Sequence, residues 1–178
     1  LHTNTAISTV DRIIDQFPAE QQEQIRTMLA SSLKGVVAQC LVKKIGGGRV
    51  AAHEILYVND AVASCIREGK IHMVSSIMQS QKALGNILMD ESLMNYVVAG
   101  QITPEDAFIK SIAKLDFKDA LDKRGISLDM EKIGSADPEL AKNMAAAGNA
   151  GGAPGAKKPE PGKMGAPGMK KPDGMSSS

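Results

Sequence analysis

The chain has little aromatic character and few of the residue types from which catalytic and metal sites are often built. Of its 178 residues, 3% are aromatic, none is tryptophan, 2 are cysteine and 3 are histidine. Its core must therefore be aliphatic, and it lacks the stacking platforms that bind single-stranded nucleic acids. Lys and Arg total 21 against 20 Asp and Glu, a net charge of +1. This balance argues against a nucleic-acid partner and against binding to an anionic membrane surface.

The isolated cysteines and histidines form no recognisable site. Cys40 and Cys65 are too far apart in sequence to indicate a zinc cluster or a redox pair, so we expect both to be reduced and partly buried. Because a lone histidine is most often structural, we expect His53 to be a hydrogen-bonded strand residue and His72 to lie on the surface. No metal is predicted.

Several sequence signals are missing altogether. There is no GxxxxGK[ST] loop, HExxH, CxxC or nucleophile elbow, and no run approaches the roughly 20 apolar residues of a membrane helix. No signal peptide is visible. Since the chain opens on Leu1 without a start-like segment, we expect a fragment that begins inside a domain.

Composition divides the chain into three zones. Residues 1–117 are patterned and globular, and residues 118–144 are weakly patterned, which predicts a weakly ordered helical extension. Residues 145–178 contain no Leu, Ile, Val or Phe and are rich in Ala, Gly, Pro, Lys and Met. Such a segment cannot bury enough apolar surface to offset its ordering entropy, which predicts a disordered tail.

The first half of the globular zone predicts two helices and a hairpin. Ser8 is expected to begin a helix, with Pro18 separating it from a second over 19–34 that Gly35 stops. The apolar run 36–42 predicts a strand covered on both faces. We expect the strand 49–58 to pair with it. The stretch Gly46-Gly47-Gly48-Arg49 between them has no helix N-terminus and predicts a turn, not a phosphate cradle. The helical stripes are expected to comprise Ile7, Val10, Ile13, Ile14 and Phe17, then Ile25, Met28, Leu29 and Leu33.

The second half predicts helices alone. Asn59 or Asp60 should cap a short helix closed by Gly69, and Thr103 with Pro104 should begin the last one. The expected inward-facing residues are Val62, Cys65 and Ile66; Met73, Val74, Ile77 and Met78; Leu88, Leu93, Met94, Val97 and Val98; and Phe108, Ile112 and Leu115.

Three strings together resemble the PilT-type secretion ATPases. LHTNTA (1–6) followed by TVDRIIDQFP (9–18) is similar to the end of that family's His box and the helix after it. VKKIGGGRVAAHEI (42–55) resembles the family's hairpin segment, and AVASCIRE (61–68) resembles the AIRNLIRE motif of pilus retraction ATPases. The strings occur in order and cover roughly residues 1–115.

The resemblance implies the C-terminal part of a RecA-like α/β ATPase core, here mostly helical with one antiparallel β-hairpin. It implies a homohexamer that uses ATP and Mg²⁺ to power type IV pilus retraction and twitching motility. The motor would act in the cytoplasm, peripherally, at the inner-membrane platform of the pilus. His2 would be an accessory residue near the nucleotide phosphates. The pilus-coupling motif would comprise Ala61, Val62, Ile66, Arg67 and Glu68.

Departures from the family pattern leave alternatives open. Ala63-Ser64-Cys65 replaces the central Arg-Asn-Leu of the coupling motif, and Ser80-Gln81-Lys82-Ala83 stands where a glycine-rich turn is usual. An accessory retraction ATPase, a pilus-extension or type II secretion ATPase, or a non-enzymatic adaptor with the same fold are the competing interpretations. Since the chain holds no Walker A loop, we expect it to bind no cofactor and to hydrolyse no ATP by itself.

Overall fold

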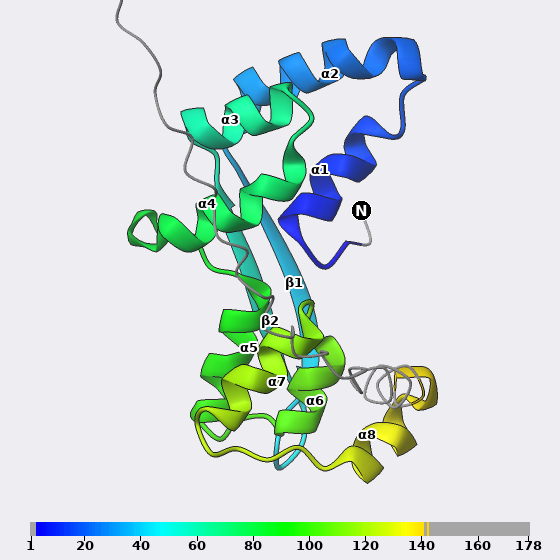
Figure 1. Ribbon diagram of the computed structural model, residues 1–178, viewed down its shortest axis with the longest axis vertical. Coiled ribbons are helices and arrows are strands. Elements are labelled where there is room, and N and C mark those ends of the chain that lie inside the picture. Colours follow the sequence, from blue (N-terminus) through cyan, green and yellow to red (C-terminus); the bar gives the residue numbers. More distant parts are fainter. Residues whose placement is uncertain (1–2, 141, 143–178) are drawn as a thin grey trace, which may run out of the picture.

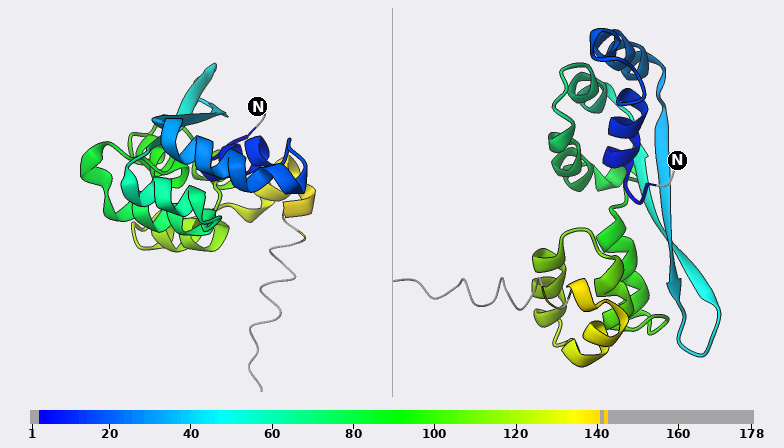
Figure 2. Two further views of the ribbon diagram at one scale, coloured as in Figure 1. Left: turned by 90° about the horizontal axis from the view of Figure 1, so that it is seen from above. Right: turned by 90° about the vertical axis from the view of Figure 1, so that its right-hand side faces the viewer.

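A computed structural model describes residues 3–140 and 142 of the chain. A long two-stranded hairpin runs along the molecule, and helices pack against one of its faces (Figures 1 and 2). The elements in chain order are α1 (Ala6–Ile14), α2 (Ala19–Ser32), β1 (Gly35–Lys43), β2 (Arg49–Tyr57), α3 (Asp60–Arg67), η1 (Ile71–Met73), α4 (Val74–Ser80), η2 (Lys82–Leu84), α5 (Met89–Val98), α6 (Pro104–Lys110), α7 (Lys114–Asp122) and α8 (Met130–Ala136).

The strands pair as predicted. They are antiparallel, and the register runs from Gly35 opposite Tyr57 to Lys43 opposite Arg49. All three glycines of the connecting turn adopt positive φ, which only glycine does without strain. The predicted turn is therefore confirmed.

The prediction that the first strand is covered on both faces is wrong. Its residues alternate strictly between buried and exposed, and Val37 and Leu41 on the outer face keep 68% and 55% of their surface exposed. The helices lie on the other face alone (Figure 2). The apolar run 36–42 does not reveal this one-sided burial, because Val37 and Leu41 on the outer face are apolar as well.

The buried residues form two separate clusters, one at each end of the hairpin. We call the first lobe the set of helices α1–α4, which pack on Val36 and Leu56. The second lobe is the set α5–α8, which pack on Cys40, Val42 and Ala52. The pair Ala38 and Glu54 lies between the two clusters on the inner face of the hairpin. Figure 1 shows the two groups of helices at opposite ends of the strands.

Helix boundaries follow local capping signals with two corrections. Asn59 and Thr103 cap α3 and α6 as predicted, each side chain accepting a backbone N–H. The cap of α1 is Thr5, not Ser8, since the Thr5 hydroxyl accepts the Ser8 N–H. The α2 helix ends at Ser32, and Gly35 instead begins β1.

The last predicted helix is broken into two. Its expected inward residues include Ile112 and Leu115, which are 51% and 65% exposed, while Phe108 is fully buried as predicted. The chain turns extended at Ser111, ending α6, and restarts as α7 at Lys114. Further residues assigned to inward stripes lie exposed at the surface, namely Phe17, Met28, Met73 and Val98.

The zone boundary expected near residue 117 stays a prediction. Phe117 and Leu121 of α7 and Ile133 of α8 are buried in the same cluster as Phe108 of α6. The predicted tail, 145–178, lies outside the described residues.

Candidate functional site

A groove of about 660 Å³ separates the two lobes on the helical side of the hairpin. Thr5 and Ile7 line it from the first lobe, together with Ser75, Ser76 and Gln79 of α4. The opposite wall comes from the start of α5, residues 88–91, and from the link and helix that follow α6, residues 112–124. Its floor includes the carboxylate of Glu54 from β2.

Glu54 is the residue that connects the two walls. Its Oε1 accepts a hydrogen bond of 2.6 Å from the Ala6 N–H at the start of α1, and its Oε2 accepts one of 3.1 Å from the Met89 N–H at the start of α5. The side chain is 4% exposed. Burial raises the pKa of this carboxyl above its ordinary value. The hydrogen bonds from the two backbone N–H groups lower the pKa, and the nearby negative charge of Asp90 raises it.

The segment that enters α1 is held by a dense set of hydroxyl contacts. Thr5 caps the helix, its hydroxyl lying 2.6 Å from that of Ser8. The Thr9 hydroxyl donates to the Thr5 carbonyl at 2.7 Å and lies 2.7 Å from the Thr3 hydroxyl. Residues 3–6 are thus fixed against α1. His2, the predicted accessory residue, lies outside the described residues.

The N-terminus of α1 is not an open phosphate cradle. The Ala6 N–H donates to Glu54, the Ser8 N–H to the Thr5 hydroxyl and the Thr9 N–H to the Thr5 carbonyl. A buried carboxylate also occupies the position at which an anion would bind. Among residues 3–140 and 142, no three His, Cys, Asp or Glu side chains come together as metal ligands. These residues therefore do not by themselves fit a nucleotide phosphate or its Mg²⁺.

The other wall of the groove is built around Asp90. Its carboxylate accepts the Ile112 and Ala113 N–H groups at 2.7 and 2.9 Å, which holds the link between α6 and α7 against α5. Lys114 then caps α6, donating from Nζ to the carbonyls of Phe108, Ile109 and Ser111 at 2.6–2.8 Å. Partial burial lowers the pKa of the Lys114 ammonium. This pair of caps explains why the helix predicted as continuous is broken.

The predicted coupling motif divides into two parts on α3. Val62 and Ile66 are buried in the first lobe, whereas Ala61, Arg67 and Glu68 are exposed. Exposed residues are the ones that a partner can reach, so the motif offers three side chains at most.

The C-terminal end of α3 is closed by local interactions. Glu68 pairs with Lys70 at 2.8 Å, and hydrogen bonding to Lys70 lowers the pKa of Glu68. Gly69 follows in the left-handed conformation, as predicted for a helix stop. Arg67, in the last turn, complements the helix dipole.

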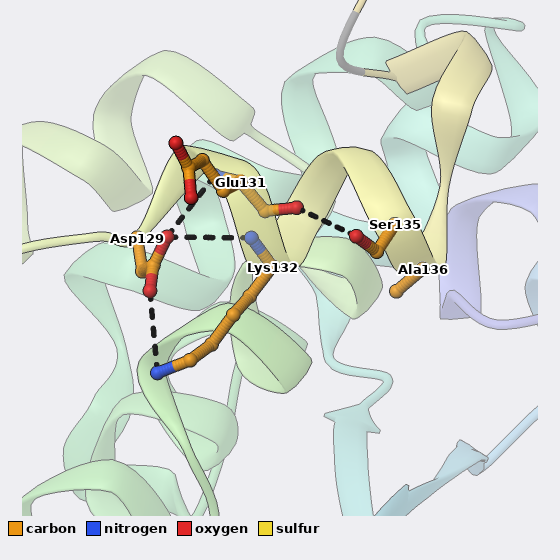
Figure 3. Close-up of a pocket in the computed structure, with 5 residues that line it drawn as sticks. All are labelled: Asp129, Glu131, Lys132, Ser135 and Ala136. Atoms are coloured by element: carbon orange, nitrogen blue, oxygen red, sulfur yellow. Dashed lines mark hydrogen bonds and ion pairs between the residues drawn. The ribbon is translucent and has the colours of Figure 1, made fainter.

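A second hollow, beside α8, is explained by helix capping (Figure 3). Asp129 Oδ1 accepts the Glu131 and Lys132 N–H groups, its Oδ2 pairs with Lys132 Nζ at 3.3 Å, and the Ser135 hydroxyl donates to the Glu131 carbonyl. The interactions drawn in Figure 3 are local contacts at the start of α8 and within it, and the hollow is not a candidate site.

The remaining singled-out residues have ordinary places. Cys40 and Cys65 are free and buried, as expected. His72 is exposed, as expected. The N–H of His53 donates to the hydroxyl of the buried Ser92 at 3.1 Å, so this strand residue anchors the hairpin to α5 through its backbone.

Sequence reasoning missed Glu54, Asp90 and Lys114. A signal was present for Glu54, because it alternates with Ala52 and Leu56 on the strand face that points to the core. A charged residue at such a position is buried only with partners. Nothing local marks Asp90 or Lys114, whose partners are set by tertiary structure.

The fold is that of the corresponding part of a pilus retraction ATPase. A solved structure described as the pilus retraction motor PilT with bound ADP matches 65% of this chain at 46% identity with a TM-score of 0.58. The ATPase DotB of Legionella pneumophila matches at 22% identity with a TM-score of 0.51, which supports the fold alone. The predicted fold class, a partial α/β ATPase core that is mostly helical with one hairpin, is confirmed.

Comparison of the sequence with curated proteins also identifies pilus retraction ATPases as similar. The type IV pilus retraction ATPase PilT of Pseudomonas aeruginosa is 46% identical over 107 residues, or 60% of this chain. A twitching motility protein of Neisseria gonorrhoeae is 50% identical over 108 residues. The pilus ATPase PilU of Pseudomonas aeruginosa is 33% identical over 136 residues, or 76% of this chain. The resemblance to retraction ATPases is confirmed.

These matches cover only part of each relative. The chain spans 31% of the PilT of Pseudomonas aeruginosa, 29% of the gonococcal protein and 32% of the solved PilT. No protein-family model matches the chain. None of the helices within residues 3–140 and 142 is long and apolar enough to cross a membrane.

Proposed function

We propose that the chain is part of a subunit of a hexameric ATP-hydrolysing motor that powers type IV pilus retraction and twitching motility. The observation that carries this proposal is the 46–50% identity, over 107 and 108 residues, to two proteins named for pilus retraction and twitching. The motor would use ATP with Mg²⁺ and act peripherally on the cytoplasmic side of the inner-membrane pilus platform.

In this proposal the described residues position other parts of the subunit and transmit force, and they do not take part in the hydrolysis of ATP. Because the Ala6, Ser8 and Thr9 N–H groups at the start of α1 are already bonded, the phosphates would be bound by groups outside residues 3–140 and 142. ATP supplies the free energy when it is bound and hydrolysed. Residues 3–6, which follow His2 in sequence, are held against α1 at the edge of the groove.

Force would leave the subunit through the exposed end of α3. Arg67 and Glu68 lie there beside each other, and the helix behind them is anchored by Val62 and Ile66 in the core of the first lobe. A rigid helix that presents two charged side chains can pass a movement of the lobe to a partner. The partner would be a protein of the pilus base.

The proposal is tested with the full-length protein that contains this sequence. We expect Mg²⁺-dependent ATP hydrolysis, and we expect His2→Ala to lower turnover while hexamers still form. His72→Ala is the matched control, because His72 is an exposed histidine on η1 to which no role is assigned. Absence of ATP hydrolysis in the full-length protein would refute the motor and favour a non-enzymatic adaptor. Unchanged turnover in His2→Ala would refute the role given to His2.

One specific observation favours a second candidate within the same class. The similarity to PilU extends over 136 residues, further than the 107 matched to PilT, although at the lower identity of 33%. An accessory retraction ATPase is therefore the second candidate. Restored retraction when this protein is the only such ATPase in a cell favours the main motor, and restoration only beside a second ATPase favours the accessory one.

A further inference from the structure

Glu54 occupies a position where an apolar residue would be expected. Its neighbours on the inner face of β2, Ala52 and Leu56, are 0% and 1% exposed and belong to the two hydrophobic clusters. Taking a carboxylate out of water is costly unless hydrogen bonds replace its hydration. Among the described residues, its hydrogen-bond donors are two backbone N–H groups and no cationic side chain.

Those two donors begin helices of different lobes. Ala6 is the first residue of α1, 48 positions before Glu54, and Met89 is the first residue of α5, 35 positions after it. One oxygen of the carboxylate binds each of them. A single side chain on the hairpin therefore fixes the starts of two helices across the floor of the groove.

We propose that Glu54 is a positioning residue of the motor: through the Ala6 N–H it sets the place of residues 3–6, which follow His2 in sequence, and through the Met89 N–H it ties that place to the second lobe. This inference rests on the proposed function. It assigns Glu54 a role that its packing alone does not require, because a leucine would fill the same strand face without joining the two helices.

The geometry makes the glutamate hard to replace. A carboxylate accepts at both oxygens, whereas the amide of glutamine has one accepting oxygen and an NH₂ group that would face an N–H donor. Glu54→Gln therefore keeps one of the two links and breaks the other. Aspartate is one methylene shorter and cannot reach both N–H groups from the same backbone.

The test uses the full-length protein with Glu54→Gln, and Glu105→Gln as the matched control. Glu105 also accepts a backbone N–H, that of Asp129 at 3.0 Å, and joins α6 to α8, away from residues 3–6. Hydrogen exchange is followed over residues 3–9 and 86–91, the affinity for ADP is measured with Mg²⁺ present, and Tm is measured without nucleotide.

We expect Glu54→Gln to speed exchange in both segments and to weaken ADP binding by about fivefold or more, since small misplacements have large effects at such sites. Glu105→Gln should leave ADP affinity within about twofold. Faster exchange with unchanged ADP affinity would overturn the inference. A wild-type protein that binds no ADP would instead overturn the proposed function, and the inference with it.

A second variant covers the case in which Glu54→Gln does not fold. Ala6→Pro removes the N–H from the other end of the same link, at the first helical position, where proline is favoured. Thr5 before it is already extended, with φ −134° and ψ 155°, as a residue preceding proline must be. The same loss of ADP affinity is expected, and unchanged affinity in this folded variant would overturn the inference.

Discussion

The Ala6 N–H donates a 2.6 Å hydrogen bond to Oε1 of Glu54, although 48 positions separate the two residues in sequence. The bond joins the start of α1 to the middle of the hairpin, between the two hydrophobic clusters. The second oxygen of Glu54 is bound by Met89 of the other lobe. The relative position of the lobes therefore depends on a buried charge.

That buried charge predicts a pH dependence of stability. Burial raises the pKa of Glu54 in the folded state above the ordinary value of 4.5, so the folded protein binds more protons than the unfolded chain between these two values. Stability should therefore fall as the pH rises through this window, and it should be greater below it. We expect the free energy of unfolding of wild type minus that of Glu54→Gln to decrease from pH 4.5 upward.

Urea unfolding at several pH values measures this difference. The subtraction removes the contributions of other carboxyls, such as Asp11, whose pKa burial also raises. A difference that is constant with pH, or that increases from pH 4.5 upward, would contradict the assignment of Glu54 as a desolvated carboxyl.

A pair of leucines on α7 tests whether this helix belongs to the core. Leu121 is 0% exposed and Leu115 is 65% exposed on the same helix. Leu121→Ala should destabilise the protein by about 2–5 kcal/mol, because it removes buried methyl groups and leaves a cavity. Leu115→Ala should change stability by about 0.5 kcal/mol or less. Equal effects of the two substitutions in denaturant titrations would show that α7 does not pack as described.

The exposed end of α3 predicts a separation of hydrolysis from movement. Arg67 and Glu68 are exposed, and replacing both with Ala should leave Tm within about 2 °C. If this surface transmits force, the full-length double variant should hydrolyse ATP at a substantial rate while cells lose twitching. Val62→Ala and Ile66→Ala provide the contrast, because these buried residues should lower Tm. Normal twitching by the double variant at wild-type protein levels would refute the coupling surface.

Local chemistry made much of this fold predictable. The hairpin, its glycine turn and the caps at Asn59 and Thr103 depend on neighbouring residues, and each is found where the sequence predicts it. The resemblance to retraction ATPases could be recognised from the sequence because three matching strings occur in the same order as in that family. The predictions that were wrong concern features that depend on contacts between residues distant in sequence. The break after Ser111 depends on Asp90, 22 positions before Ile112, and no local pattern reports that bond.

The candidate site was less predictable than the fold. Of the predicted motif on α3, the apolar spacing correctly separated Val62 and Ile66, which are buried, from Arg67 and Glu68 at the surface. Glu54 lies within the string 42–55 that resembles the family's hairpin, but its sequence context alone indicates no role. Its function depends on the two helix starts that meet it, and these become neighbours only when both lobes fold onto the hairpin.

The proposal with the widest consequences is that the full-length protein containing this chain withdraws pili by retraction. The most direct measurement is the number of surface pili, together with twitching, in cells that lack the full-length gene and in the same cells complemented with it. We predict that cells without the gene keep or accumulate surface pili but do not twitch, because pili are assembled and not withdrawn. Wild-type protein should restore twitching, and His2→Ala should restore it poorly. Loss of surface pili on deletion would contradict the account, because it would make the protein an extension motor, and so would unchanged piliation with normal twitching.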